Sequence, residues 1–175
     1  MLPLLQALHT RLDTVLLSHC EADHVGGAPA VLGMQLQAML LNSLASDARL
    51  QNLRPVQCCV AGQNWEWDGV QFDIMHTQAA DYGKPHKPNA VSCVLRIQSV
   101  GPQSQTALLV GDIERPHEDH LLAAQAALKA DVLLVPHQGS KTSSSEAFLA
   151  AVQPRQAWVQ AVYCNRYGHP ALEVM

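Results

Sequence analysis

Residues 18–27 read Ser-His-Cys-Glu-Ala-Asp-His-Val-Gly-Gly and directly follow the apolar run Val15-Leu16-Leu17. Two imidazoles and two carboxylates fall within six residues of this loop. Imidazole nitrogen and carboxylate oxygen both suit zinc, manganese or iron, and this spacing can serve two adjacent ions. Because surface loops also collect charged side chains, the loop alone leaves a metal site and a solvated loop as alternatives.

Two later stretches repeat the pattern of an apolar run that ends in a potential metal ligand. Residues 108–111 (Leu-Leu-Val-Gly) precede Asp112, and residues 133–136 (Leu-Leu-Val-Pro) precede His137. Three strand-like runs that each deliver His or Asp at their end favour one shared site. We therefore interpret the three stretches as parts of a metal site.

The order of these motifs resembles the metallo-β-lactamase-like domain at the C-terminal end of ComEC-type DNA-internalisation (competence) proteins. The similarity extends over nearly the whole chain. Its motifs are Ser18 to Gly27, Asn89 to Ser92, Gly111 to Glu114, Pro136 to Ser140, and the ending Asn165 to Pro170. The first motif marks the broad metallo-β-lactamase superfamily, whereas Gly-Asp-Ile-Glu and Pro-His-x-Gly-Ser in this order indicate the competence branch.

The resemblance implies a fold, a cofactor and a set of site residues. The fold is an α/β metallo-β-lactamase-like αββα sandwich, and the cofactor is a divalent metal, as two ions of manganese or zinc, with magnesium also possible. The implied metal ligands are His19 and Glu21 for one ion, Asp23 and His24 for the second, Asp112 in a bridging position, and His137. The implied catalytic residues are Asp23, Asp112, His137 and His169, and the implied substrate-binding residues are Ser140, Lys141 and Asn89. For Asp112, a loop start or helix cap is the alternative.

The chain departs from the family pattern at two positions: Glu21 replaces the family's Asp, and Gln138 replaces a second His. Asn89 fits the family motif but stands where the wider superfamily places a third histidine. The extra methylene of Glu21 moves its carboxylate by about one bond length, whereas metal distances tolerate about 0.2 Å. His76 either substitutes for the missing histidine or is only hydrogen-bonded at a strand end.

The function implied by the resemblance is metal-assisted phosphodiester hydrolysis, which degrades one strand of incoming DNA while the other crosses the membrane. A water held between two ions attacks phosphorus, while Ser140 and Lys141 orient the substrate. His169 either protonates the leaving oxygen or touches phosphate, or it only forms a turn with Gly168 and Pro170. The departures favour an alternative, a non-catalytic domain of the same fold that binds DNA or a channel partner.

Residues 1–175 are expected to form one domain, because 48% are hydrophobic and no Ser- or Pro-rich linker divides them. The superfamily fold begins with strands ahead of the metal loop that lack counterparts here. We therefore expect a truncated sandwich with an unpaired sheet edge, as a fragment of a longer membrane protein. The expected partners are single-stranded DNA and the membrane channel part of that protein, with no small-molecule cofactor. The expected location is a soluble domain of an inner-membrane protein, on a side that the sequence leaves open.

Charge and cysteine content exclude other classes. A formal net charge of −4 argues against purely electrostatic DNA binding, although bound metal changes the local field. No run approaches the ~18 apolar residues of a membrane span. The five cysteines are odd in number and lack C-x-x-C spacing, so we expect reduced, partly buried thiols. Cys20 is either a soft metal ligand or points away from the site.

Apolar runs and turn residues predict the secondary structure. Strands are predicted at Thr14 to Ser18, Val56 to Val60, Asn64 to Trp67, Val70 to Met75, Val91 to Gln98, Thr106 to Val110, Asp131 to Val135 and Ala157 to Val162. Helices are predicted at Pro29 to Met34, at Pro116 to Lys129, and after a capping box of Ser143 and Glu146. Asp68-Gly69 predicts a type I′ turn. Trp65 and Trp67 face one side of their hairpin, where core packing is favoured over base stacking.

Overall fold

The computed structural model describes residue 7 and residues 10–43, 48–82 and 84–175. The strands are β1 (Thr14–Leu17), β2 (Met39–Asn42), β3 (Val56–Cys58), β4 (Asn64–Trp67), β5 (Val70–His76), β6 (Val94–Ser99), β7 (Thr106–Leu109), β8 (Val132–Leu134) and β9 (Gln156–Trp158). The α-helices are α2 (Ala22–Val25), α3 (Ala28–Met34), α4 (Ala48–Gln51), α5 (Arg115–Ala123) and α6 (Glu146–Val152). Three 3-10 helices are η1 (Ala79–Asp81), η2 (Pro88–Val91) and η3 (Pro136–Gly139).

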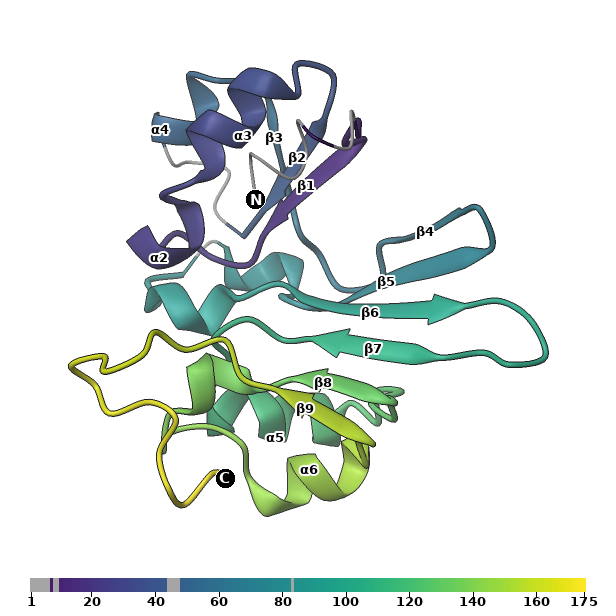
Figure 1. Ribbon diagram of the computed structural model, residues 1–175, viewed down its shortest axis with the longest axis vertical. Coiled ribbons are helices and arrows are strands. Elements are labelled where there is room, and N and C mark those ends of the chain that lie inside the picture. Colours follow the sequence, from purple (N-terminus) through teal and green to yellow (C-terminus); the bar gives the residue numbers. More distant parts are fainter. Residues whose placement is uncertain (1–6, 8–9, 44–47, 83) are drawn as a thin grey trace.

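The strands form two sheets (Figure 1). The first sheet has the order β1-β2-β3 and is parallel throughout. The second has the order β4-β5-β6-β7-β8-β9, antiparallel up to β7 and parallel from there. Parallel neighbours need a crossover connection, and the helices supply it: α2 and α3 lead from β1 to β2, α5 from β7 to β8, and α6 from β8 to β9.

Three apolar clusters fill the interfaces between four layers. One packs the first sheet against α2, α3 and α4, and another packs the second sheet against α5 and α6. The third lies between the sheets and includes Leu41 of β2 and Ile74 of β5. Alternation along the strands explains the arrangement, because Leu40 faces the helices while its neighbour Leu41 faces the other sheet. The layers are those of the predicted αββα sandwich.

Most predicted elements are present. β4 has the predicted bounds, and Asp68 and Gly69 both have positive φ angles, 47° and 74°, as a type I′ turn requires. Trp65 stacks on Phe72 with ring centroids 5.2 Å apart, which confirms packing for this residue. The described part of the chain contains no helix long and apolar enough to cross a membrane.

Several boundaries were wrong, and β2 and the short helices α2 and α4 were missed. β6 begins at Val94 rather than Val91, because the preceding residues form η2. α5 ends at Ala123, well before Lys129. The strand predicted at Ala157 begins at Gln156 and ends at Trp158.

The predicted capping box before α6 is wrong. The N-cap is Ser145, whose hydroxyl accepts a hydrogen bond from the Phe148 N–H at 3.3 Å. Ser143 is buried instead, and its hydroxyl donates to the carbonyl oxygens of Pro136 and Ser140, both at 2.9 Å. Ser143 therefore fixes the turn that follows β8, close to the predicted site.

The prediction of reduced thiols is wrong for two cysteines. Cys59 and Cys93 form a disulfide, are both buried, and are separated by 34 residues. Cys59 follows β3 and Cys93 precedes β6, so the bond joins the two sheets. Sequence spacing contained no sign of the pairing, because the fold alone brings these residues together.

Candidate metal centre

His19, His24 and Asp112 come from different elements and form one group, called the metal cluster below. His19 follows β1, His24 lies in α2, and Asp112 follows β7 of the other sheet. Gly111 permits this approach: its φ is +55°, and a Cβ atom there would lie 2.8 Å from the Cβ of Ser18. Glycine therefore lets the end of β7 lie against the histidine loop.

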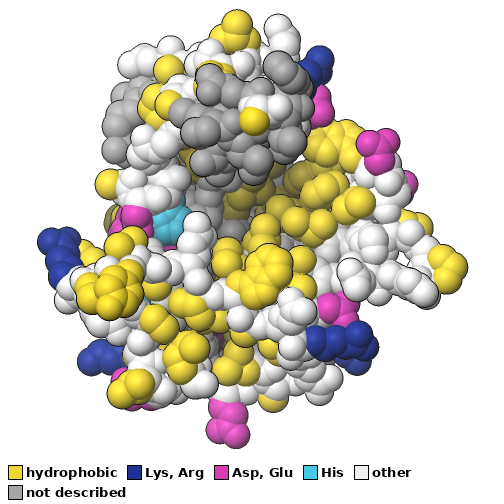
Figure 2. Space-filling view, in the orientation of Figure 1, with side chains coloured by type: hydrophobic (Ala, Val, Ile, Leu, Met, Phe, Trp, Pro, Cys, Tyr) yellow, Lys and Arg dark blue, Asp and Glu magenta, His cyan; other side chains and the backbone are white. Residues whose placement is uncertain are grey.

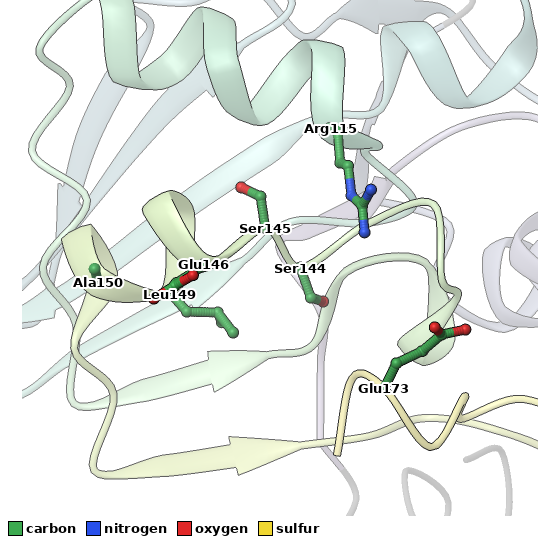
Figure 3. Close-up of a pocket in the computed structure, with 7 residues that line it drawn as sticks. All are labelled: Arg115, Ser144, Ser145, Glu146, Leu149, Ala150 and Glu173. Carbon is green, nitrogen blue, oxygen red and sulfur yellow. The ribbon is translucent and has the colours of Figure 1, made fainter.

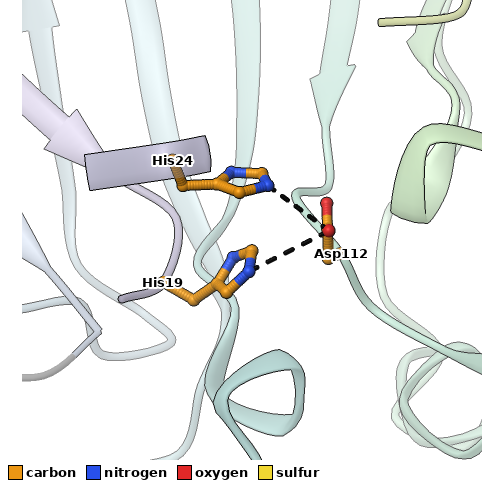
Figure 4. A group of neighbouring side chains, drawn as sticks. All are labelled: His19, His24 and Asp112. Carbon is orange, nitrogen blue, oxygen red and sulfur yellow. Dashed lines mark ion pairs between the residues drawn. The ribbon is translucent and has the colours of Figure 1, made fainter. Parts of the chain in front are cut away.

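The three side chains of the metal cluster point toward one another (Figure 4). Asp112 Oδ2 lies 3.3 Å from His24 Nε2 and 3.9 Å from His19 Nε2. One ligand atom from each residue lies within 4.8 Å of the others. Among the residues that the structure describes, no second group of three His, Cys, Asp or Glu side chains meets this spacing. The fold thus brings three of the predicted ligand residues together.

His19 tests whether the cluster fits a metal ion. Its side chain is fully buried, and its Nε2 has no hydrogen-bond partner. Burial, with the charge of His24, lowers the pKa of His19 to about 4, so the ring is neutral at pH 7. Its Nδ1 lies 3.1 Å from the hydroxyl of Ser18 and 3.4 Å from that of Ser92, which leaves Nε2 to present its lone pair. An unpaired buried nitrogen costs about 1–3 kcal/mol, and a metal ion at this position removes that cost.

Asp112 and His24 stabilise each other's charged form. Burial alone would raise the pKa of Asp112, but the hydrogen bond and charge of His24 lower it below its usual value. Burial alone would lower the pKa of His24, but the hydrogen bond and charge of Asp112 raise it. Imidazole binds metal in its neutral form, so an ion that binds here displaces the proton of His24.

Glu21 and Asp23 add two carboxylates at the outer side of the metal cluster. Glu21 Oε2 lies 4.0 Å from His19 Nε2, and Asp23 Oδ2 lies 3.6 Å from His24 Nε2. Their side chains are 44% and 55% exposed, in contrast to the buried Asp112. These distances pair each carboxylate with the histidine to which the sequence assigned it.

His137 reaches the metal cluster from a strained turn after β8. His137, Gln138 and Gly139 all have positive φ angles, 49°, 55° and 79°. Two successive non-glycine residues in this region are held only where the surrounding structure determines them, often at functional sites. The turn places His137 Nε2 4.0 Å from Asp112 Oδ2. His137 therefore lies where a further ligand was predicted.

Two residues that the sequence did not assign hold the other nitrogen of His137. Glu114 Oε1 lies 3.5 Å from His137 Nδ1, and Thr142 Oγ1 lies 3.3 Å from the same atom. The Thr142 hydroxyl donates to Glu114 Oε1 at 2.7 Å, which fixes the carboxylate. A carboxylate behind a ligating histidine commonly orients its ring. The Gly-Asp-Ile-Glu motif contained Glu114, but only the fold shows what it contacts.

Gln138 contacts Asp23 of the histidine loop. Its side-chain amide donates a hydrogen bond to Asp23 Oδ2 at 2.7 Å, across 115 positions of sequence. The departure at position 138 thus replaces an imidazole with an amide that already engages one oxygen of a predicted ligand.

The remaining predicted site residues lie at different depths. Asn89 Nδ2 lies 3.5 Å from His137 Nε2, and its Oδ1 is buried without a partner. The His169 ring lies 5.8 Å from the His137 ring. Ser140 is buried, and its hydroxyl contacts that of Thr142 at 3.1 Å, whereas Lys141 is exposed. Asn89 and His169 therefore border the centre.

No family model matches the chain. It is 36% identical over 162 residues to Competence protein ComA of Neisseria gonorrhoeae, a match that covers 91% of this chain and 21% of that protein. It is 33% identical over 179 residues to Recombination protein 2 of Haemophilus influenzae, a match that covers 99% of this chain and 21% of that protein. It is 30% identical over 175 residues to ComE operon protein 3 of Bacillus subtilis, which covers 94% of this chain and 22% of that protein. The chain spans about a fifth of the length of these relatives.

Solved structures resemble the fold at low sequence identity. Igni18, a metallo hydrolase from the archaeon Ignicoccus hospitalis, gives a TM-score of 0.54 at 20% identity, covering 83% of this chain and 61% of its own. CmlA β-hydroxylase gives 0.56 at 11% identity, covering 84% and 36%. The fold is metallo-β-lactamase-like. The fold class predicted from the sequence is thereby confirmed.

A second group of imidazoles lies elsewhere in this metallo-β-lactamase-like fold and is called the rear histidine cluster: His76, His117 and His120. The ring of His76 is 5.7 Å from that of His117 and 6.4 Å from that of His120. His76 Nδ1 donates to the carbonyl oxygen of Ser92 at 2.9 Å. Of the two alternatives for His76, the hydrogen-bonded strand end agrees with this contact. The sequence assigned His117 and His120 no partners.

Surface shape alone does not mark the metal centre of the metallo-β-lactamase-like fold. A depression of about 570 Å³ lies at the start of α6 (Figure 3). It is lined by Arg115, Ser144, Ser145, Glu146, Leu149, Ala150 and Glu173, which include none of the predicted site residues.

Cys20 contacts Asn42, whose side-chain amide donates to its sulfur at 3.2 Å, as expected for a thiol directed away from the metal cluster.

Proposed function

We propose that this chain is a metal-dependent phosphodiester hydrolase domain that acts on single-stranded DNA during competence-type DNA uptake. One observation carries the proposal: the buried, unpartnered Nε2 of His19 lies 3.9 Å from the ionised Asp112. The names of the relatives, a competence protein and a recombination protein among them, support DNA as the substrate class. The metallo hydrolase among the structures of similar fold supports hydrolysis as the reaction class.

The proposed cofactor is a pair of divalent ions, manganese or zinc, with magnesium as a further option. His19 and Glu21 would hold one ion, Asp23 and His24 the other, with Asp112 between them and His137 as a further ligand. Three nitrogen donors are accompanied by three carboxylates, a mixture that suits zinc and manganese. When bound, such ions lower the pKa of water and neutralise the charge of phosphate.

The protein's own residues supply position and charge. Asp112 stays ionised at neutral pH because of His24. Glu114 and Thr142 hold the His137 ring in place. Burial and the charge of His137 lower the pKa of His169, which favours its neutral ring. We assign His169 to a hydrogen bond with the phosphate and the exposed Lys141 to orientation of the substrate strand, whereas the buried Ser140 would act only through its contact with Thr142.

A second candidate is a non-catalytic domain that binds DNA or a channel partner. The hydrogen bond from Gln138 to Asp23 favours it, because a carboxylate oxygen engaged by an amide is a weaker ligand. Restoring the family residues at both positions, Glu21→Asp with Gln138→His, separates the candidates. Cleavage that appears only in this double variant supports the non-catalytic domain.

The direct test is cleavage of an end-labelled single strand of DNA with manganese, zinc or magnesium added. We expect metal-dependent cleavage that Asp112→Asn abolishes and that the matched variant Asp119→Asn, an exposed position on α5, leaves unchanged. A folded wild-type protein that cleaves with none of the three metals would overturn the hydrolase proposal.

The proposed partner within the whole protein is its membrane channel, and the proposed place is next to an inner membrane. The disulfide between Cys59 and Cys93 favours the side away from the reducing cytosol, where such bonds persist. A thiol count on the protein isolated from its native membrane, with and without prior reduction, tests this placement. Two additional thiols after reduction are expected.

A further inference from the structure

Three side chains after β9 form a ladder beside the metal centre, called the aromatic ladder: His169, Tyr167 and Arg166. The Tyr167 and His169 rings are nearly parallel, 19° apart, with centroids separated by 5.8 Å. The Arg166 guanidinium lies 4.7 Å from the centre of the Tyr167 ring and hydrogen-bonds its hydroxyl. The inner end of the ladder, His169, faces the ring of His137. The ladder thus runs outward from the metal centre.

The aromatic ladder is held in place by its own loop. The Asn165 side-chain oxygen accepts hydrogen bonds from the N–H groups of Tyr167 at 3.1 Å and His169 at 3.0 Å. Directly after the ladder, the Ala171 N–H donates to the Gly139 carbonyl at 2.8 Å. Gly139 belongs to the strained turn that carries His137. The loop therefore fixes the ladder relative to the proposed ligand.

Tyr167 is largely exposed although its ring contacts Arg166 and His169. Its side chain is 66% exposed, whereas Trp65, the aromatic residue predicted to pack, stacks on Phe72. In the space-filling view, basic and apolar side chains gather at the left edge below acidic and His side chains (Figure 2). An exposed aromatic ring beside a guanidinium is the pair of groups that binds a nucleobase and its phosphate.

We infer that the aromatic ladder is a subsite for single-stranded nucleic acid. A base stacks on the Tyr167 and Arg166 pair, and the adjacent phosphate accepts hydrogen bonds from the guanidinium N–H groups that Tyr167 does not use. The strand then continues past His169 to the metal cluster. In a duplex the bases are stacked on one another, so the subsite selects single strands. The inference rests on the proposed function and names how that site holds its substrate.

The test measures binding without hydrolysis, by fluorescence anisotropy of a labelled twelve-nucleotide deoxythymidine strand in the presence of a chelator. Tyr167→Ala should weaken binding roughly 5- to 150-fold, the range for loss of one stacked base. Tyr167→Phe should bind within about twofold of wild type, because the ring is kept. The control is Tyr163→Ala, at a residue that is 93% exposed in the same segment. Equal binding by wild type and Tyr167→Ala, or an equal loss in Tyr163→Ala, would overturn the subsite.

A change in the strand checks the same contact from the other side. Wild type should bind an abasic strand more weakly than the deoxythymidine strand, by the same factor that Tyr167→Ala loses on the deoxythymidine strand. Tyr167→Ala should bind the abasic strand and the deoxythymidine strand equally well. The subsite would be contradicted if removing the bases weakened binding equally in wild type and Tyr167→Ala. It would also be contradicted if wild type bound no strand at all. Hydrolysis of bis-p-nitrophenyl phosphate, which needs no base subsite, is measured separately. Its presence leaves the proposed hydrolase standing when the subsite fails.

Arg166 is tested through salt. Each phosphate contact on a single strand contributes about 0.7 to the slope of log affinity against log salt concentration. Arg166→Gln should therefore reduce that slope by about 0.7. Arg155→Gln, at an exposed arginine that pairs with Asp131, should leave it unchanged. An unchanged slope in Arg166→Gln would remove arginine from the subsite.

Discussion

The metal cluster and the rear histidine cluster meet at Ser92, yet they differ in what surrounds their nitrogens. The Ser92 hydroxyl faces His19 of the metal cluster, and the Ser92 carbonyl binds His76 of the rear histidine cluster. His19 keeps an unpartnered buried nitrogen directed at Asp112. Within the described residues, no carboxylate forms an ion pair with a ring of the rear histidine cluster. The number of imidazoles in a cluster is therefore a poor guide to metal binding. A carboxylate beside an unpartnered imidazole nitrogen is the better indication of a metal site.

The largest expected effect is a loss of stability when the disulfide is removed. It concerns both clusters, because Cys93 is next to Ser92, which contacts a histidine of each. Replacing Cys59 and Cys93 with alanine removes a cross-link that closes 34 residues. The free energy of unfolding should fall by about 3–4 kcal/mol, the loop-closure value for this length. Urea unfolding of the double variant and wild type measures it, with Cys164→Ala as the exposed control. Equal stability of double variant and wild type would contradict the disulfide.

A smaller change should separate the clusters. The Ser18 hydroxyl lies 3.1 Å from Nδ1 of His19 and 3.0 Å from Nδ1 of His24, so Ser18→Ala frees two ligand rings. Loss of such an outer contact typically lowers metal affinity roughly 10- to 100-fold. Thr77, whose hydroxyl lies 3.3 Å from His76 Nδ1, provides the matched variant Thr77→Val. Competition with a metal-binding dye measures both, and equal affinities in the two variants would count against the distinction.

The smallest expected effect is a pH dependence in the rear histidine cluster. Burial, with the charges of His117 and His120, lowers the pKa of His76 despite the Ser92 hydrogen bond and the nearby Asp81. The folded protein therefore favours neutral His76. The stabilisation is present above the unfolded pKa of about 6.5 and is lost as pH falls below it. Urea midpoints at pH 7.5 and 5.5 should differ less in His76→Gln than in wild type, both with chelator. If the urea midpoint of His76→Gln fell between pH 7.5 and 5.5 by as much as that of wild type, His76 would not be the source of the pH dependence.

The sequence predicted what local pattern determines. Apolar runs ending in His19, Asp112 and His137 located three strand ends, and the fold brings those side chains together as expected. The hairpin at Asp68-Gly69 was predicted because both residues tolerate positive φ. The strand ends and the hairpin depend on neighbouring residues alone, so a single sequence suffices for them.

What the sequence missed depends on contacts between distant residues. The pairing of Cys59 with Cys93 and the contact of Gln138 with Asp23 each join separate elements, and no spacing rule indicates either. β2 was missed because its apolar residues are buried on both faces and do not alternate with polar ones.

The central claim is that the metal cluster, His19, His24 and Asp112, binds a divalent metal ion. Equilibrium dialysis against manganese or zinc, followed by elemental analysis, measures bound metal in wild type, Asp112→Asn and His120→Asn. We predict metal in wild type and His120→Asn and its loss in Asp112→Asn. Metal retained in a folded Asp112→Asn, or lost in His120→Asn alone, would contradict the account.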